Sequence, residues 1–517
     1  MPQITLSPTA TRLNAAQGQP LRDILFEHGV EFPCGGQGRC RGCRVRIRSG
    51  SGTPNGVELD RLTPQELADG WRLACQCRVE TDMEVELRQW DAAVLTDDTA
   101  FRFTAQEGAG IAIDLGTTTL VAQLLDLETG RVLAVRTALN QQARYGADIM
   151  SRIQFAMSDG GQLLLESAIR GQLGGLVRQL CQAAGVELGR LRRITLVGNT
   201  VMHHLFCGIS VEPLSMVPFE AQHAGLQTIC AAALDWCLAE CAVVQFLPCL
   251  GGFVGSDLLA GILATQLHTR REPSVLIDLG TNGEILVGNR DRILCTSTAA
   301  GPAFEGARIA MGMRAASGAI WKVGVDGGVM TCEVLGDGEP RGLCGSGLVD
   351  AAAAGLDIGV INPSGRLDGG RDIALAGPVS LTQADIRQLQ MAKGAIAAGL
   401  RILLRMFGAE TAQIEHVFLA GAFGNYVDRA SARRIGLLNF PLDVIEPVGN
   451  TALLGAKVAL CSGSDSDASY PDICRLAEHV PLHAAVDFQE TFVDQMGFPT
   501  QSCPEPIAVG AAAGHSG

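Results

Sequence analysis

The sequence lacks the features that mark membrane, secreted and nucleic-acid-binding proteins. It has 54 acidic against 40 basic residues, a net charge of -14, so no basic stripe can form against phosphates. Its longest apolar stretches, such as 396–404, are too short or too interrupted to span a bilayer, and the N-terminus does not read as a signal peptide. We therefore expect a cytoplasmic protein whose partners are neither membranes nor nucleic acids.

A further absence concerns nucleotide binding. The pattern Gly-x₄-Gly-Lys-Ser/Thr does not occur, which excludes the P-loop class of ATPases. Tyrosine is also rare, with three residues, whereas glycine is abundant, with 63. A Gly-rich chain of 517 residues is typical of α/β proteins with tight strand-to-helix turns, and it has room for three or four domains.

Cysteine is plentiful, but its distribution argues against disulfides. The total of 17 is odd, and thirteen of these residues are scattered outside the motif described next. Without an export signal in so large a chain, they are expected to be reduced thiols within the core.

Three cysteines are crowded into one Gly-rich loop. Cys34, Cys40 and Cys43 lie in the run CGGQGRCRGC, and Cys75 follows in the run LACQ. The loop glycines permit positive φ and a close approach of the backbone, so N–H groups can point at bridging sulfides. A four-cysteine zinc site is the competing interpretation, and uncoordinated thiols are a third. Zinc motifs usually present two Cys-x₂-Cys pairs and this chain has one, so the pattern favours an iron–sulfur cluster.

The N-terminal region around this loop resembles a [2Fe–2S] ferredoxin domain of the α+β, ferredoxin-like (β-grasp) class. Its spacing, Cys-x₅-Cys-x₂-Cys, differs from the plant-type Cys-x₄-Cys-x₂-Cys and looks like the other common branch. A hairpin over 4–13, a short helix over 21–28 and an alternating strand over 43–48 are expected. The resemblance implies that the cluster ligands are Cys34, Cys40, Cys43 and Cys75.

Cys77 is a rival for the fourth ligand. It follows Cys75 by two residues, and a period of two would place both side chains on the same face of a strand. The sequence leaves both open, and the match to LACQ favours Cys75.

A strand–turn–strand pattern occurs twice further along the chain. Residues 111–119 read IAIDLGTTT and residues 275–283 read VLIDLGTNG, so Asp-Leu-Gly-Thr recurs 164 positions later. A strand that ends in Asp, followed by Gly and Thr at a sharp turn, places amides and hydroxyls around phosphate, while the carboxylate reaches Mg²⁺ through water. A structural cap of the turn is the alternative for Asp114 and Asp278, but the duplication favours two phosphate-binding hairpins.

The two hairpins, followed by the strand 417–420 and the run GAFG, resemble the actin-like ATPases over residues 108–465. The resemblance implies a two-lobed α/β fold with a ribonuclease H-like duplicated core that binds ATP and Mg²⁺ between its lobes. It implies catalytic carboxylates at Asp114 and Asp278. The implied ATP-binding residues are Gly116, Thr117, Thr118, Thr119, Gly280, Thr281, Asn282, Gly283, Gly345, Ser346, Gly347, Gly421, Ala422, Phe423 and Gly424.

Some of these assignments have plain alternatives. Gly345–Gly347 could equally form a turn that leads into a helix beginning at Leu348. Glu284 and Asp257 could position water, or could be exposed or capping residues. The pair His203–His204 is expected to pack in the interior rather than bind a metal.

A ferredoxin domain in front of an actin-like ATPase resembles the reductive activators of corrinoid proteins. That family implies an ATP-dependent return of an inactive Co(II) corrinoid to Co(I) on a protein of a methyltransferase system, with the electron passing through the cluster. It also implies a low-potential electron donor and makes a homodimer plausible. The segments that extend the resemblance are 140–149, 151–153, 198–202, 300–306 and 487–489.

Three rival functions are weaker. A small-molecule kinase of the same fold would need an acceptor pocket with a base, and it leaves the cluster unexplained. A chaperone-type ATPase would use the cluster as a redox sensor. Activators of 2-hydroxyacyl-CoA dehydratases have no N-terminal ferredoxin domain. The expected domains are 1–92 (ferredoxin domain), 93–107 (linker), 108–270 (first lobe), 271–502 (second lobe) and 503–517 (flexible tail).

Overall fold

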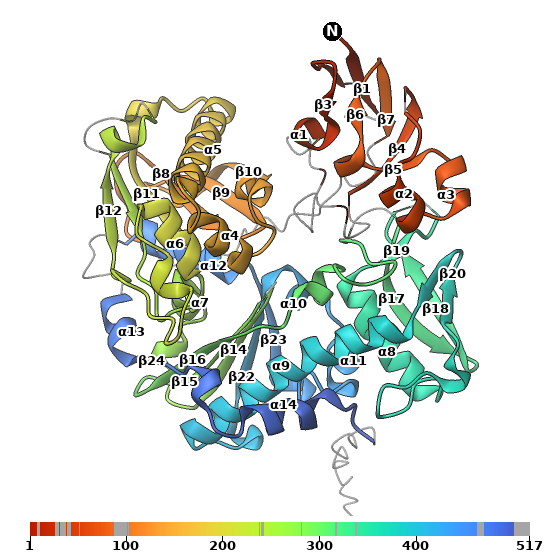
Figure 1. Cartoon of the computed structure of the whole chain (residues 1–517). Coiled ribbons are helices and arrows are strands. Elements are labelled where there is room, and N and C mark those ends of the chain that lie inside the picture. Colours follow the sequence, from red (N-terminus) through yellow and green to blue (C-terminus); the bar gives the residue numbers. More distant parts are fainter. Residues whose placement is uncertain are drawn as a thin grey trace, which may run out of the picture.

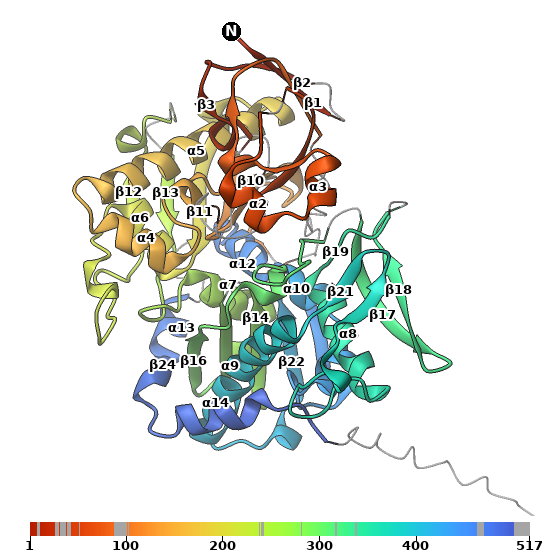
Figure 2. The same cartoon turned by 45° about the vertical axis from the view of Figure 1, so that its right-hand side comes forward.

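The computed structural model shows three bodies in chain order (Figures 1 and 2). The N-terminal domain is red to orange in both views, the first lobe is orange to yellow-green, and most of the second lobe is green to blue. The structure describes residues 1–7, 11–25, 30, 38, 43–50, 52–86, 101, 103–236, 238, 242–280, 282–315, 318–336, 339–462 and 470–500.

The N-terminal domain is a mixed five-stranded sheet in the order β2-β1-β7-β4-β5. The only parallel pair within this sheet, among the residues described, is β1 with β7. Alternate strand residues such as Ile4, Leu6, Val45 and Ile47 are buried, as the period-two pattern predicts. The strands are β1 (Gln3–Ser7), β2 (Thr11–Asn14), β4 (Arg44–Ser49), β5 (Trp71–Leu73) and β7 (Met83–Glu86), with β3 (Gln19–Pro20) paired to β6 (Arg78–Val79).

Three short helices complete this domain. They are α1 (Leu21–Leu25), α2 (Gly56–Arg61) and α3 (Pro64–Ala68). Helices α2 and α3 each begin with a capping box, Asn55 with Glu58 and Thr63 with Glu66, which satisfies N–H groups that the first turn leaves open. The expected ferredoxin-like fold and its opening hairpin are confirmed; the helix expected over 21–28 is described only to Leu25.

The first lobe contains a six-stranded sheet in the order β10-β9-β8-β11-β13-β12. Strands β8, β9 and β10 form an antiparallel meander, and β11 and β13 add parallel to β8. The bounds are β8 (Ala109–Leu115), β9 (Thr119–Asp126), β10 (Val132–Leu139), β11 (Leu191–Gly198), β12 (Gln227–Cys230) and β13 (Val243–Phe246).

Read from the opposite edge, the second lobe repeats this order as β16-β15-β14-β22-β23, and β24 is added beside β16. Strands β14, β15 and β16 again form an antiparallel meander, and β22 and β23 run parallel to β14. The duplicated core expected from the repeated Asp-Leu-Gly-Thr motif is therefore confirmed. The bounds are β14 (Ser274–Leu279), β15 (Gly283–Gly288), β16 (Ile293–Thr298), β22 (His416–Ala420), β23 (Ile445–Gly449) and β24 (Ala477–His479).

Smaller sheets and helices surround the two cores (Figure 1). The small strands are β17 (Ala319–Asp326), β18 (Val329–Val334), β19 (Gly342–Leu343), β20 (Ile373–Ala376) and β21 (Val379–Leu381). The helices are α4 (Ile149–Ala156), α5 (Gly161–Ala184), α6 (Thr200–Cys207), α7 (Ser256–Thr265), α8 (Gly345–Asp357), α9 (Gln383–Phe407), α10 (Gly421–Tyr426), α11 (Arg429–Arg434), α12 (Thr451–Leu460), α13 (Tyr470–Leu476) and α14 (Phe488–Met496).

Helices α7 and α12 pack together where the two lobes join. One hydrophobic core combines Ala112 of the first sheet, Leu276 of the second, and residues of both helices. The helices approach so closely that a Cβ on Gly455 would lie 2.0 Å from the Ala260 carbonyl oxygen. A shared core across the joint makes the two lobes one structural unit.

Two segments connect the first lobe to its surroundings. Within the expected linker, the Thr104 N–H donates to the Cys461 carbonyl at 3.1 Å, and the Gln106 N–H donates to the Leu127 carbonyl at 3.0 Å. The 3₁₀ turn Gln141–Arg144 lies on the other side, where Ala143 packs against the core of the N-terminal domain. None of the helices in the described ranges has both the length and the apolarity to cross a membrane.

The close contact of α7 with α12 gives a stability prediction. Gly455→Ala should lower the free energy of unfolding by about 1–3 kcal/mol, because the added methyl group forces the helices apart. The matched control is Gly171→Ala on the exposed side of α5, where a Cβ meets nothing within 4 Å. That change should be neutral or stabilising by up to about 1 kcal/mol. Urea unfolding of both variants measures the difference, and equal shifts would contradict the tight contact.

Candidate functional site

Two of the four expected cluster ligands lie in the described residues. Cys43 is buried immediately before β4, and Cys75 is half-buried in the 3₁₀ turn Ala74–Gln76. The Ala74 N–H donates to the Cys43 carbonyl at 3.0 Å, which ties the two cysteine segments together. Cys34 and Cys40 lie outside the described residues.

One glycine of the cysteine run, Gly38, lies within the described residues and contacts the Cys75 turn. Gly38 has a φ of +69°, in the left-handed region that favours glycine. A Cβ there would lie 2.8 Å from Gln76 Nε2 and 2.8 Å from Val57 Cγ1. Gly38 therefore lies directly against the Cys75 turn, and its positive φ disfavours any other residue at this position.

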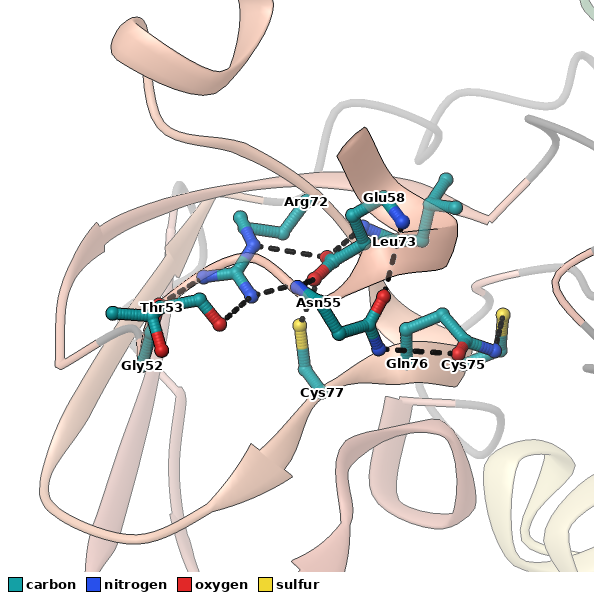
Figure 3. Close-up of polar contacts among 9 residues, drawn as sticks. All are labelled: Gly52, Thr53, Asn55, Glu58, Arg72, Leu73, Cys75, Gln76 and Cys77. Atoms are coloured by element: carbon teal, nitrogen blue, oxygen red, sulfur yellow. Dashed lines mark hydrogen bonds and ion pairs between the residues drawn. The ribbon is translucent and has the colours of Figure 1, made fainter. Parts of the chain in front are cut away.

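Cys77 points away from this region. The expectation that Cys75 and Cys77 share a strand face is wrong, because Ala74–Gln76 forms a 3₁₀ turn between β5 and β6. Cys77 is 7% exposed, and its Sγ lies 3.7 Å from Glu58 Oε1 (Figure 3). Burial, and then the Glu58 carboxylate, raise the pKa of Cys77 to about 12. The residues present therefore fit a cluster bound through Cys75 better than one bound through Cys77.

A buried ion pair supports the Cys75 turn from behind. Arg72 donates to both Glu58 oxygens at 2.7 and 2.9 Å, and the Leu73 N–H donates to Glu58 Oε1 at 3.1 Å (Figure 3). Burial opposes ionisation of Glu58, but the Arg72 hydrogen bond and two backbone N–H groups lower its pKa below the ordinary value. This pair was not predicted from the sequence, in which the capping-box pattern Asn55–Glu58 is the one available indication.

The first phosphate hairpin is the turn between β8 and β9. The Gly116 N–H donates to the Thr119 carbonyl at 3.2 Å, and a Cβ on Gly116 would lie 2.5 Å from that oxygen. The Asn140 N–H donates to the Thr118 carbonyl at 2.8 Å, and Asn199 Nδ2 donates to Thr117 Oγ1 at 2.8 Å. The residues expected from the motif are thus brought together in one turn.

Two side chains hold this turn from inside the lobe. Asn140 Nδ2 donates to the Gly116 carbonyl at 2.9 Å, and the fully buried Arg152 donates to the Thr117 carbonyl. Arg152 also donates to the Gly146 carbonyl at 2.9 Å and to Gln142 Oε1 at 3.2 Å. Burial lowers the pKa of Arg152 to about 9. Segments 140–149 and 151–153 extend the family resemblance in the sequence. Their role in supporting the first hairpin was not predicted and comes from the structure.

The second hairpin lies between β14 and β15, and it lies next to the run GAFG, residues 421–424. The Gly280 N–H donates to the Asn282 carbonyl at 3.0 Å; Thr281 lies outside the described residues. Gly283 is buried against Ile396 of α9. Gly421 has a φ of +83°, and a Cβ there would lie 2.6 Å from Asp278 Oδ1. The start of α10 and the second Asp are therefore neighbours.

Four carboxylates near the hairpins, those of Asp114, Asp257, Asp278 and Glu284, influence one another electrostatically. Burial raises the pKa of both Asp114 and Asp278 to about 7 and that of Asp257 to about 6. The pKa of Glu284 is also raised well above its ordinary value, by burial and then by repulsion from Asp257 and Asp278. Asn450 Nδ2, at the start of α12, donates to Asp114 Oδ2 at 3.0 Å. Asp257 and Glu284 are thus members of the site rather than exposed residues.

The run GAFG, residues 421–424, begins the short helix α10. The Phe423 ring stacks on Phe304 with a centroid distance of 4.6 Å and an interplanar angle of 22°. A Cβ on Gly345 would lie 1.9 Å from the Phe304 carbonyl oxygen, so the start of α8 abuts the same ring pair. Gly424 follows on α10; for Ala422 only the backbone is described.

Gly345, Ser346 and Gly347 form the first turn of α8, which begins three residues before the expected Leu348. The Ser346 hydroxyl donates to the Trp321 carbonyl at 2.8 Å inside the lobe. The pair His203–His204 is fully buried on α6, where His204 Nδ1 contacts the Thr200 carbonyl at 2.8 Å, so the packing interpretation is confirmed.

The fold and site define a class: an actin-like ATPase that carries a ferredoxin-like domain at its N-terminus. Three sequence families match the chain in order. They are the 2Fe-2S iron-sulfur cluster binding domain (residues 4–80), the RACo middle region (109–270) and the C-terminal domain of RACo, the ASKHA domain (272–506).

Similar proteins identify the family. The chain is 35% identical to the corrinoid activation enzyme RamQ of Eubacterium limosum, over 74% of this chain and 69% of that protein. It is 28% identical to the [Co(II) methylated amine-specific corrinoid protein] reductase of Methanosarcina barkeri, over 76% and 78%. A solved reductive activator for a corrinoid, iron-sulfur protein aligns with a TM-score of 0.68 and 27% identity, over 96% and 98%. The chain belongs to the reductive activators of corrinoid proteins.

The carboxylate cluster gives a prediction on pH. Because folding raises the pKa of Asp114 and Asp278 from 3.8 to about 7, the folded nucleotide-free protein binds more protons at these groups than the unfolded chain does. Their contribution to stability is present at acidic pH and is lost as the pH rises toward about 7. The urea midpoint of the nucleotide-free protein should therefore contain a component that falls across this window.

Asp257→Asn tests the cause. Asp257 raises the pKa of Asp114, Asp278 and Glu284, so its neutralisation should flatten the pH dependence of the urea midpoint. Glu490→Gln on α14, outside this cluster, is the control. An unchanged slope in Asp257→Asn would contradict the mutual repulsion.

Proposed function

We propose that this protein uses ATP to return an inactive Co(II) corrinoid cofactor on a partner protein to Co(I). The observation that carries the proposal is the presence, in one chain, of a cysteine-lined cradle and a carboxylate-lined junction between two phosphate hairpins. Family membership supports the same reaction. The small-molecule kinase alternative uses the second site but leaves the first without a role, and the chaperone alternative uses the first only as a redox sensor.

The proposed cluster ligands are Cys34, Cys40, Cys43 and Cys75. The tight approach of Gly38 to the Cys75 turn and the inward direction of Cys77 support this set. When bound, a [2Fe–2S] cluster supplies a carrier for one electron. The protein's own part is to hold two ligand segments together through the Ala74–Cys43 hydrogen bond and the buried Glu58–Arg72 pair.

The proposed nucleotide site uses the two hairpins for phosphate and the start of α10 for adenosine. Among the described residues, no three acidic, His or Cys side chains are grouped for direct binding of one metal ion. We propose that the nucleotide phosphates and water molecules hold Mg²⁺, and that Asp114 and Asp278 accept hydrogen bonds from this water. A cation there would offset the repulsion that raises the pKa of these carboxylates.

ATP has a clear energetic role in such a reaction. Plant-type [2Fe–2S] centres have potentials near roughly −400 mV, and a shortfall of about 100 mV for one electron costs about 2.3 kcal/mol. ATP hydrolysis releases more than this. We infer that nucleotide binding changes the angle between the lobes at the α7–α12 contact and so controls docking of the corrinoid protein.

The remaining assignments are part of the same proposal. The domains are taken as 1–92, 93–107, 108–270, 271–502 and 503–517, and the protein as cytoplasmic. Its partners would be a corrinoid protein of a methyltransferase system and a low-potential electron donor, with a homodimer as the assembly.

The test of the reaction is anaerobic. Protein, a Co(II) corrinoid protein, a low-potential reductant and ATP are mixed, and the cobalt absorption spectrum is followed. Co(I), or the methylated cofactor, should form faster and further with ATP than without it. A cobalt spectrum that is the same with and without ATP would overturn the proposal.

Two variants should separate the two modules. Cys40→Ala should abolish cobalt reduction while ATP binding persists, because it removes a cluster ligand. Asp278→Ala should retain the visible absorbance of the cluster and lose the ATP dependence. Loss of the cluster in both variants would contradict the division of roles.

The choice of fourth ligand has its own test. Cys75→Ser should shift or abolish the visible absorption of the reconstituted cluster, since an oxygen replaces a ligand sulfur. Cys77→Ser, the matched control two residues away, should retain the native spectrum because that thiol faces Glu58. The reverse outcome would assign the ligand to Cys77.

A further inference from the structure

The side chain of Gln76 lies beside the sulfur of Cys75. Gln76 Nε2 donates to Cys75 Sγ at 3.4 Å, and both side chains are half-buried (Figure 3). No function described above uses Gln76. If Cys75 is a cluster ligand, as proposed, this amide N–H is a hydrogen-bond donor to a ligand sulfur.

The orientation of the Gln76 amide is fixed by the chain. The Glu58 N–H donates to Asn55 Oδ1 at 3.0 Å, in the cap of α2. A backbone N–H can only donate, so this end of Asn55 must be its oxygen and the other end its NH₂ group. Asn55 Nδ2 in turn donates to Gln76 Oε1 at 3.2 Å, which leaves the Gln76 NH₂ group facing the sulfur.

The position of the amide is also restricted. A Cβ at Gly38 would lie 2.8 Å from Gln76 Nε2, so the backbone at position 38 lies directly against the amide. Asn55 holds its opposite end. The Gln76 side chain is therefore confined between the cap of α2 and the cysteine loop, as Figure 3 shows for Asn55, Gln76 and Cys75.

We propose that Gln76, oriented by Asn55, is a positioning residue that sets the reduction potential through the Cys75 sulfur. Reduction adds one electron and increases the negative charge on the ligand sulfurs, so an N–H donor stabilises the reduced state more than the oxidised state. Gln76 thereby raises the potential. This inference rests on the proposed assignment of Cys75 as a ligand.

The experiment measures the midpoint potential of the reconstituted full-length protein by anaerobic redox titration, followed by visible absorbance and EPR. Gln76→Leu should make the potential more negative, with a reduction equilibrium about threefold to tenfold less favourable, where tenfold corresponds to ~59 mV for one electron. Gln76→Glu, of the same shape, should shift it in the same direction because an anionic acceptor replaces the donor.

Asn55→Ser tests the orienting step. Serine also caps helices, so α2 should persist, but the amide that holds Gln76 is gone. A smaller negative shift is expected. Gln65→Leu is the control, since Gln65 is an exposed glutamine of the same domain that bonds only Asp69 among the contacts described.

The outcomes separate the inference from the proposed function. A Gln76→Leu potential equal to that of Gln65→Leu, or more positive, overturns the role of Gln76 even if Cys75→Ser shows that Cys75 is a ligand. An unshifted Asn55→Ser overturns the orienting role. If Gln76→Leu fails to assemble a cluster, Gln76→Glu and Asn55→Ser decide the matter, and unshifted potentials in both reject the inference.

Discussion

The burial of several mutually repelling carboxylates is the constraint on which the ATPase part depends. Asp114 and Asp278 end equivalent strands of two sheets, and Asp257 at the start of α7 adds a third charge between them. Without a compensating cation, burial and mutual repulsion favour the protonated forms. The fold tolerates this cost because the surrounding cores are extensive and the Asn450 amide offsets part of it. Because the ionised carboxylates are disfavoured in this site, a ligand that carries positive charge would be stabilised there.

The geometry that creates this arrangement comes from duplication. Each sheet has an Asp near the end of its first strand, Asp114 or Asp278, and α7 and α12 join the sheets through one shared core. The close approach of Gly455 to Ala260 shows that the two helices are tightly packed at this joint. Relative motion of the lobes must therefore pass through a tightly packed contact, which favours a small number of defined lobe angles over continuous flexing.

Much of this could be predicted from the sequence, and the reasons for the rest are physical. The repeated Asp-Leu-Gly-Thr motif predicted the duplicated core, because the hairpin at the end of each strand depends on local sequence. The buried Glu58–Arg72 pair, the direction of Cys77 and the role of Arg152 depend on contacts between residues 6 to 35 positions apart. Period-two reasoning failed at Cys75 because a 3₁₀ turn interrupts the strand there, and no residue of the run LACQ marks such a turn.

The short turn Gln141–Arg144 has two neighbours that are far apart in the chain. Asn140, immediately before it, holds the Gly116 and Thr118 carbonyls, whereas Ala143 within it packs against the core of the N-terminal domain. One turn of backbone thus separates the wall of the phosphate hairpin from the domain that carries the cysteines. A ferredoxin module exchanged from another protein would keep its cluster yet lose its fit to this turn. Recombination in this family should therefore preserve the two parts as a matched pair rather than as interchangeable modules.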